Sequence, residues 1–253
     1  MRTLVVTGAA SGIGMATVER VRRDGARTIG VDLHDADVIA DLGSATGRAA
    51  MLDAVAALAP DGIDGVVAAA GISALDRPEA VLSINYFGAV ATLNGLVGLL
   101  AKKPRPRAVV IGSTAALLPS DERTVAACLA GDETEARAHI LKRPATAYAS
   151  SKLAVSRWLR RAAISPEWAG SGILLNGIAP GVVETAMTLP LLQDDSMLAL
   201  IAQSNPMAVQ GFAQPEEIAE LINYLLTFDG HYLLGQMIFC DGGTDAILRP
   251  EGF

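Results

Sequence analysis

The sequence predicts an α/β fold of three layers, with a doubly wound, seven-stranded parallel sheet in the middle. Two observations predict it. Short apolar runs alternate with helix-length segments from end to end, which is typical of right-handed strand–helix–strand units. The hydrophobic fraction is 51%, as expected where the strands of a sheet are buried on both faces. The 253 residues suit a single domain, 1–253, without a linker or an internal repeat.

The predicted strands are Thr3–Thr7, Arg27–Asp32, Val38–Asp41, Gly65–Ala70, Ala108–Gly112, Ile173–Ile178 and Gln236–Cys240. Helical stretches lie between most of them, among them Ile13–Arg23, Thr46–Leu58 and Ala147–Trp168. Two longer segments interrupt this alternation: the charged, alanine-rich segment 119–144 and the Leu- and Met-rich segment 184–214. Both follow strands at the carboxyl edge, where open α/β sheets bind ligands. We therefore expect an insertion at 119–144 and a substrate lid at 184–214.

Composition excludes several classes of function. The net charge of −7 argues against a nucleic-acid partner, and the basic run Lys102–Arg107 ends a helical stretch, where cations complement the helix dipole. Cys128 and Cys240 have no histidine at ligand spacing, so we expect no metal site. We also expect no disulfide between them, because the sequence shows no export signal.

We also expect no membrane association. The longest apolar stretch, Phe87–Ala101, is interrupted by Thr92 and Asn94 and falls short of a bilayer span. The first strand begins at Thr3, which leaves no room for a signal peptide, and a cytoplasmic enzyme is the expectation.

A glycine-rich turn follows the first predicted strand. Gly8, Gly12 and Gly14, with Ser11 and Ile13 between them, open the first predicted helix. Glycine lets the backbone approach a pyrophosphate, and the helix N-terminus supplies N–H donors and a positive dipole end. Glycines also make ordinary strand-to-helix turns, but this position favours a dinucleotide site of the Rossmann type.

The second and third predicted strands end in carboxylates. Asp32 lies eighteen residues after Gly14, where a carboxylate accepts hydrogen bonds from ribose hydroxyls and repels a 2′-phosphate. Neither the glycine turn nor Leu33-His34 offers a lysine or arginine for that phosphate, so the cofactor is expected to be NAD rather than NADP. Asp41-Leu42 is expected to cap the adenine, although a plain turn carboxylate is an almost equal interpretation of Asp41.

Three further residues carry the chemistry. Tyr148 and Lys152 lie four residues apart, on one face of the predicted helix, and Ser113 ends a predicted strand. Tyr148 would be the general acid or base, with its pKa lowered by Lys152 and by a nicotinamide ring. Ser113 would donate a hydrogen bond to the substrate oxygen, and Lys152 would also bind the nicotinamide ribose.

On these residues the chain resembles the short-chain dehydrogenase/reductase family along nearly its whole length. The shared motifs are Thr7-Gly8-x-x-x-Gly12-x-Gly14, Asp41-Leu42, Ala69-Ala70-Gly71, Asn85, Ser113, Tyr148-x-x-x-Lys152, Pro180-Gly181 and Thr185. The resemblance implies a catalytic tetrad of Asn85, Ser113, Tyr148 and Lys152, in which Asn85 holds a water of the proton relay. It also implies cofactor contacts from Ala70, Gly71, Pro180, Gly181, Val183, Thr185 and the tetrad members Tyr148 and Lys152.

Within the family the chain is similar to the bacterial 3α-hydroxysteroid dehydrogenase/carbonyl reductases. The similarity lies in Val31–Leu42, in the charged segment before Tyr148 and in the ending Asp241–Pro250. It implies an NAD-dependent oxidoreductase that interconverts a bulky apolar secondary alcohol and its ketone. Another alicyclic, terpene or aryl alcohol stays open as the substrate. A non-catalytic NAD-sensing protein is disfavoured because the tetrad is intact.

The lid composition bears on the substrate. Segment 184–214 has three acidic residues and no lysine or arginine, so it offers nothing to a substrate carboxylate. Its large apolar residues are Met187, Leu189, Leu191, Leu192, Met197, Leu198, Leu200, Ile201 and Met207. Leu75, Leu117 and Leu118 follow other strands at the same edge and are expected to extend this apolar wall.

The insertion at 119–144 affects the expected oligomeric state. In relatives, the outer faces of the helix that bears Tyr148 and of the helix near Asn85–Ala101 build a subunit interface. A charged segment inserted directly before Tyr148 should cover that surface. We therefore expect a homodimer rather than a tetramer.

Overall fold

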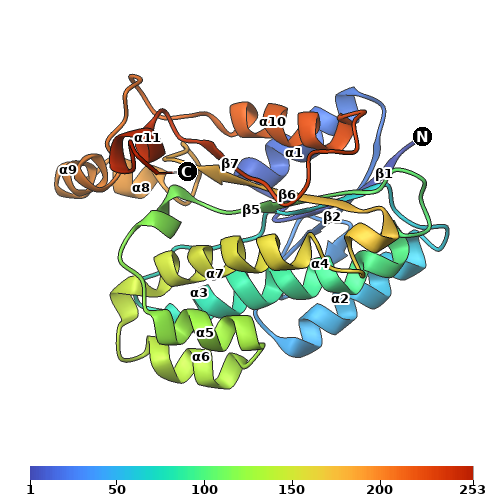
Figure 1. Ribbon diagram of the computed structural model, residues 1–253, viewed down its shortest axis with the longest axis horizontal. Coiled ribbons are helices and arrows are strands. Elements are labelled where there is room, and N and C mark those ends of the chain that lie inside the picture. The colour runs from blue at the N-terminus through green and yellow to red at the C-terminus, as the bar shows by residue number, and fades with distance from the viewer. Residues whose placement is uncertain (253) are drawn as a thin grey trace.

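A computed structural model describes residues 1–252 as one central sheet between two layers of helices (Figure 1). Within this range, seven parallel strands lie in the order β3-β2-β1-β4-β5-β6-β7. The strands are β1 (Thr3–Thr7), β2 (Arg27–Asp32), β3 (Val38–Ile39), β4 (Gly65–Ala68), β5 (Arg107–Ile111), β6 (Leu174–Pro180) and β7 (Met237–Cys240). The direction of winding reverses between β1 and β4, which opens a ligand crevice at their carboxyl ends. This confirms the predicted fold.

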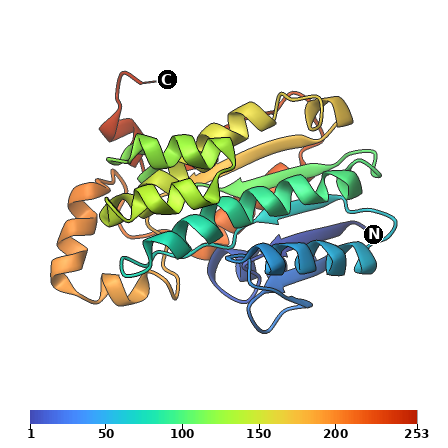
Figure 2. The ribbon, with the colours of Figure 1, turned by 90° about the horizontal axis from the view of Figure 1, so that it is seen from below.

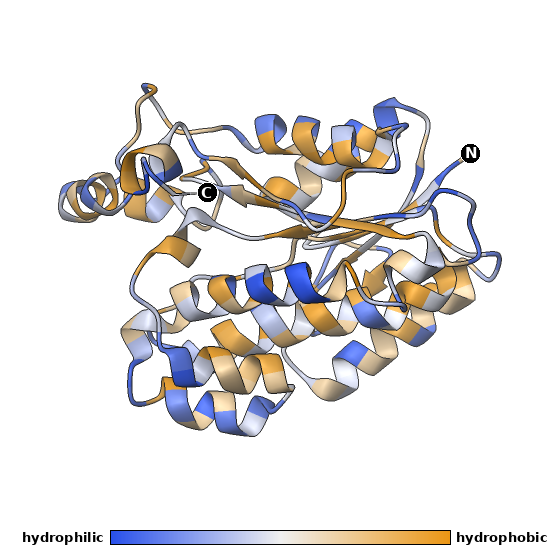
Figure 3. Ribbon diagram, viewed as in Figure 1, coloured by the Kyte–Doolittle hydropathy of each residue, from blue (hydrophilic) through white to orange (hydrophobic). Residues whose placement is uncertain are grey.

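Each face of the sheet has its own hydrophobic core. Helices α1 (Gly12–Arg23) and α10 (Pro215–Thr227) cover one face, and α2 (Ala45–Leu58), α4 (Ala89–Leu100) and α7 (Ala147–Ala162) cover the other. Side chains alternate between the two cores along a strand: Leu4 and Val6 of β1 pack in the first, and Val5 packs in the second. Figure 3 shows apolar strands between helices of mixed hydropathy.

Several predicted boundaries are wrong by a few residues. Helix α7 ends at Ala162 rather than at Trp168, because Pro166 disfavours a helical conformation at Ser165. The chain turns there instead, with the N–H of Ser165 donating to Ala162 at 2.9 Å and that of Trp168 donating to Ser165 at 3.2 Å. Among the strands, β3 and β4 end two residues early, and β6 runs on to Pro180.

The apolar helix that precedes β5 is longer than expected. It runs continuously over Pro78–Leu100, through α3 (Pro78–Leu82), the π-helical turn η1 (Ser83–Gly88) and α4. These 23 residues are long and apolar enough to cross a bilayer by length and composition, and the apolar stretch singled out in the sequence forms only their second part. Its most apolar window is 61% buried against the rest of the domain, as in a core helix.

The insertion forms a helical hairpin. Helices α5 (Glu122–Ala130) and α6 (Glu133–Ile140) are capped by Asp121 and Asp132, and they lie against α7 and α3 (Figure 1). Arg157 of α7 donates to both carboxylate oxygens of Glu122, at 2.6 and 2.9 Å. The hairpin therefore covers the outer face of the helix that carries Tyr148.

The lid extends beyond the carboxyl edge of the sheet. Its helices α8 (Leu189–Leu192) and α9 (Asp195–Ser204) have no buried residue and stand at one end of the molecule (Figure 2). The remaining elements are short: η2 (Thr114–Leu117), η3 (Pro144–Thr146), η4 (Ala169–Ser171) and α11 (Thr244–Leu248).

Candidate active site

A cavity of about 300 Å³ follows the carboxyl edge of the sheet. It extends from the ends of β2 and β3, past the glycine turn after β1, to the segments that follow β5 and β6. The predicted site residues that line it are Gly8, Ser11, Gly12, Ile13, Gly14, Asp32, Asp41, Leu42, Ala70, Gly71, Ser113, Tyr148, Lys152, Pro180, Gly181, Val183 and Thr185. Asn85 is the one predicted site residue that does not line this cavity.

The glycine turn is packed too tightly for side chains. A Cβ atom at Gly14 would lie 2.0 Å from the carbonyl oxygen of Gly8, and one at Gly8 would lie 2.9 Å from the Cα atom of Ala70. Gly8 and Gly12 also have positive φ angles, of 71° and 51°. The Ser11 side chain makes no capping hydrogen bond to α1, and the first turn of α1 holds no acidic residue. The positive end of α1 therefore faces the cavity with room for a pyrophosphate, so the turn fits a dinucleotide.

Asp32 is held rigidly at one end of the cavity. One carboxylate oxygen accepts the N–H of Ala10 at 2.9 Å, and the other accepts the N–H of Leu33 at 2.7 Å. Both oxygens keep further acceptor capacity for hydroxyl donors. Among the described residues that line the cavity, Lys152 is the one cation, and it lies at the other end, beside Ser113 and Tyr148.

The three chemical residues come together from two elements. Tyr148 and Lys152 are on α7, and Ser113 directly follows β5 as the N-cap of η2, where it accepts the N–H of Ala115 at 3.1 Å. The Ser113 hydroxyl lies close enough to the Tyr148 phenol to lower its pKa. The Lys152 Nζ atom lies 5.7 Å from the centre of the Tyr148 ring and donates to the carbonyl of Ile111 at 2.9 Å.

Asn85 lies behind the cavity wall, in the π-helical turn η1. It is buried, its amide oxygen accepts the N–H of Ile72 at 2.8 Å, and its amide nitrogen donates to the carbonyl of Ile72 at 2.9 Å. A Cβ atom at Gly71 would lie 3.2 Å from the Asn85 oxygen and 3.8 Å from Lys152 Nζ. Gly71 therefore lies between the Asn85 amide and the Lys152 ammonium group. Isolated π-helical turns are frequent at functional sites.

Several residues that shape the cavity were not predicted. The Thr7 hydroxyl accepts the N–H groups of Ala69 and Ala70, both at 3.1 Å, and so fixes the end of β4. The Thr188 hydroxyl accepts the N–H of Thr185 at 2.9 Å, and its place three residues after Thr185 is a signal that sequence reasoning could have used. Ile84 lines the cavity next to Asn85, but nothing in its sequence context indicates this.

Comparison with known proteins agrees with this geometry. Residues 2–127 match the short chain dehydrogenase family, and residues 134–245 match the family described as Enoyl-(Acyl carrier protein) reductase. The chain is 38% identical to the 3-alpha-hydroxysteroid dehydrogenase/carbonyl reductase of Comamonas testosteroni, with all of both chains covered. It belongs to the short-chain dehydrogenase/reductase family. As such it is an oxidoreductase.

Two further relatives of this short-chain dehydrogenase/reductase are informative. The cis-4-hydroxycyclohexanecarboxylate dehydrogenase of Sinomonas cyclohexanicum is 30% identical, with 97% of each chain covered. The crystal structure of the 3-alpha-hydroxysteroid dehydrogenase from Pseudomonas sp. B-0831 complexed with NADH superposes with a TM-score of 0.93. It is 36% identical, and the match covers 99% of this chain and 100% of that one.

In this short-chain dehydrogenase/reductase, burial shifts the pKa values of both Tyr148 and Lys152. Burial raises the pKa of Tyr148, and the Ser113 hydroxyl offsets only part of that rise. Burial also lowers the pKa of Lys152 to about 8. For the groups of the chain alone, the pKa of Tyr148 therefore shifts in the direction opposite to the expected one, because burial outweighs the lowering contributions. Desolvation opposes the charged forms of Tyr148 and Lys152, because a buried charge loses its hydration.

Only part of the predicted apolar wall lines the cavity. From the lid, Thr185, Ala186, Met187 and Thr188 line the cavity, while α8 and α9 do not. Leu75 is 72% exposed, and neither it nor Leu117 or Leu118 lines the cavity. The lid helices hold no buried residue, and their leucines are half-buried or exposed.

Proposed function

We propose that this short-chain dehydrogenase/reductase uses NAD(H) to interconvert a bulky, apolar secondary alcohol and its ketone. A 3α-hydroxy or 3-keto steroid is the leading candidate for the substrate. The observation that carries the proposal is the placement of the Ser113 hydroxyl and of Lys152 beside the Tyr148 phenol, in a cavity that a dinucleotide fits. The relatives named above support the steroid part.

The residues that would hold the cofactor are distributed along the cavity. Asp32 would accept hydrogen bonds from the adenosine ribose, Asp41 and Leu42 would lie at the adenine, and the N-terminus of α1 would face the pyrophosphate. Gly181 and Thr185, which follow β6, would lie at the nicotinamide. The nicotinamide, when bound, accepts or supplies the hydride.

The chain's own residues handle the substrate oxygen and its proton. The Ser113 hydroxyl would donate a hydrogen bond to the oxygen and orient it beside Tyr148. Tyr148 would give its phenolic proton to the oxygen during reduction and take it back during oxidation. Lys152 would hold positive charge next to the phenol, which favours the phenolate form. The rise in the Tyr148 pKa keeps the phenol protonated, as a proton donor must be.

The proposed substrate class follows from charge. Among the described residues from 184 to 214, the charges are all carboxylates, and the cavity lining offers no arginine. An anionic substrate would therefore be repelled by these carboxylates and would find no arginine for a bidentate ion pair. Burying a polycyclic hydrocarbon contributes about 25 cal/mol per Å² of apolar area, which is enough to supply affinity without an ion pair.

A substrate panel tests the proposal. With NAD, we expect kcat/KM to rank androsterone above a bicyclic terpene alcohol, and both above a short, charged hydroxy acid. A result in which the charged hydroxy acid ranks first would contradict the apolar-substrate proposal. A terpene alcohol ranked first by a wide margin would contradict only the steroid part.

Cofactor preference gives a second test. We expect kcat/KM to be higher with NADH than with NADPH, because Asp32 would repel the 2′-phosphate. In the double variant Asp32→Ala, Leu33→Arg, the preference should shift toward NADPH by about 100-fold or more, since a repulsive charge is replaced by an attractive one. Steady-state kinetics with both cofactors measure this. Ile164→Lys, at an exposed position that does not line the cavity, is a control for a general gain of positive charge. Equal activity of the unaltered enzyme with NADPH would refute the role of Asp32.

We also propose that the enzyme is a homodimer. The α5–α6 hairpin covers the outer face of α7, with Glu122 bound to Arg157 and Ser150 accepting the N–H of Asp121 at 2.9 Å. A tetramer built through the outer face of α7 would have to displace this hairpin. Light scattering at micromolar concentration should give the mass of two chains. A stable tetramer in that measurement would overturn the proposal.

A further inference from the structure

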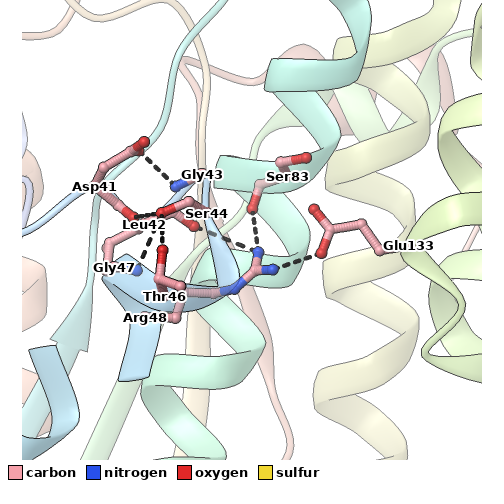
Figure 4. A network of polar contacts seen from close by, with 9 residues as sticks. All are labelled: Asp41, Leu42, Gly43, Ser44, Thr46, Gly47, Arg48, Ser83 and Glu133. Carbon is pink, nitrogen blue, oxygen red and sulfur yellow. Dashed lines mark hydrogen bonds and ion pairs between the residues drawn. The ribbon is translucent and has the colours of Figure 1, made fainter. Parts of the chain in front are cut away.

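A buried arginine connects the insertion to the wall of the cavity. Arg48, in the first half of α2, has a side chain that is only 10% exposed. Figure 4 shows its guanidinium between three segments that are distant in the sequence. One nitrogen donates to the carbonyl of Leu42 at 3.4 Å and to that of Ser83 at 3.2 Å, and another contacts the carboxylate of Glu133 at 2.5 Å.

The two carbonyls belong to segments that form the cavity. Leu42 is part of the turn after β3 and lines the cavity, and Ser83 is the first residue of the π-helical turn η1. These two segments are in tight contact. A Cβ atom at Gly43 would lie 3.2 Å from the Ile84 side chain, and one at Gly88 would lie 3.1 Å from the carbonyl oxygen of Leu42. Arg48 therefore joins, through one nitrogen, the turn that carries Leu42 to the turn that carries Ile84.

Glu133 provides the charge that this arrangement needs. A guanidinium cannot lose its proton in a protein, so burying it without a carboxylate is costly. Glu133 comes from α6, that is, from the insertion, and its side chain is 23% exposed. Neutral carbonyls at longer distances are the other partners of Arg48. Without Glu133, the guanidinium would be expected to turn toward solvent and to release Leu42 and Ser83.

We propose that Arg48 and Glu133 are a positioning pair through which the α5–α6 insertion fixes the adenine end of the cofactor site. The pair touches neither substrate nor cofactor; it acts through Leu42 and Ile84, which form the cavity wall. This rests on the proposed function, in which Asp41 and Leu42 lie at the adenine. The insertion then has two roles, one at the outer face of α7 and one in cofactor affinity.

The test measures cofactor binding at the adenine end of the site separately from the chemical step. Glu133→Gln keeps the shape of the side chain and removes its charge. We expect calorimetry to give an increase of about tenfold in the dissociation constant of ADP-ribose, which has the adenine end without the nicotinamide, as for the loss of an interaction of moderate strength. The KM for NAD should rise in parallel, while kcat at saturating NAD stays within about twofold. Glu133→Asp, which keeps a carboxylate, should recover part of the affinity.

Glu135→Gln is the matched control. Glu135 is in the same first turn of α6, and its side chain is 58% exposed and contacts only His139, at 3.4 Å. This variant removes the same charge from the same end of the helix without touching Arg48, so its affinity for ADP-ribose should be unchanged. All affinities are measured well below the melting temperature of each variant.

The outcomes are distinct. If Glu133→Gln lowers the melting temperature but binds ADP-ribose like Glu135→Gln, the pair is merely structural and the inference is wrong. If the unaltered enzyme binds neither ADP-ribose nor NAD, the proposed function itself fails, and the inference fails with it.

Discussion

Replacing Tyr148 with phenylalanine should lower kcat by about 100- to 10,000-fold, the usual contribution of a general acid or base. The phenylalanine ring keeps the packing on α7 and removes only the hydroxyl beside Ser113. Affinity for NADH should hardly change, because the lost group handles the proton of the substrate. Initial rates and fluorescence titration with NADH measure the two effects separately.

Tyr86→Phe is the matched control for this variant. Tyr86 is a second buried tyrosine, with a pKa that is also raised by desolvation, but it does not line the cavity. Its variant should keep nearly all of kcat. If Tyr148→Phe retained more than a few per cent of kcat, Tyr148 would not be the proton donor.

Replacing Lys152 with methionine should abolish most turnover, weaken NADH binding and yet stabilise the fold near pH 7. Burial lowers the pKa of Lys152 from 10.5 to about 8, so the folded protein resists the charged form. The corresponding cost is about 3 kcal/mol, and it is fully present below pH 8. Methionine removes this cost and loses the hydrogen bond to Ile111, so the net gain in the free energy of unfolding should be about 1 to 3 kcal/mol.

The pH dependence identifies the cause of this gain. Between the folded pKa and 10.5, the unfolded chain binds more protons at Lys152 than the folded one, so the unaltered enzyme gains stability as the pH rises. The advantage of Lys152→Met should therefore fade from pH 8 to pH 10.5 in urea denaturation. In Lys152→Arg the charge cannot titrate, so this variant should lose stability relative to the unaltered enzyme across the same window. A pH-independent advantage of methionine would indicate a packing effect instead.

The local sequence pattern predicted the fold because apolar runs and helix-length segments alternate repeatedly along the chain. The alternation of Leu4, Val5 and Val6 between two cores is visible as a continuous apolar run, and the glycines after β1 mark a turn that side chains could not enter. The C-terminal end of α7 was predicted wrongly, since the effect of Pro166 competes with an amphipathic pattern that continues to Trp168.

The site residues were predictable where a motif fixes the chemistry at one position. Asp32, Ser113, Tyr148 and Lys152 each follow or belong to a predicted element, and parallel strands bring their carboxyl ends to one edge. The apolar wall was not predictable in the same way. Whether the lid leucines face the cavity depends on how α8 and α9 pack, and composition carries no information about that direction.

Short local motifs thus predicted the sheet, the glycine turn and the candidate site residues, because each motif depends on residues close together in the chain. The tertiary structure alone decided the rest. It placed Asn85 behind Gly71 in a π-helical turn, and it reversed the expected direction of the Tyr148 pKa through burial. It also joined Arg48 to Glu133 across 85 residues of chain. Such effects arise from desolvation and packing between distant segments, and neither leaves a periodic signal in the sequence.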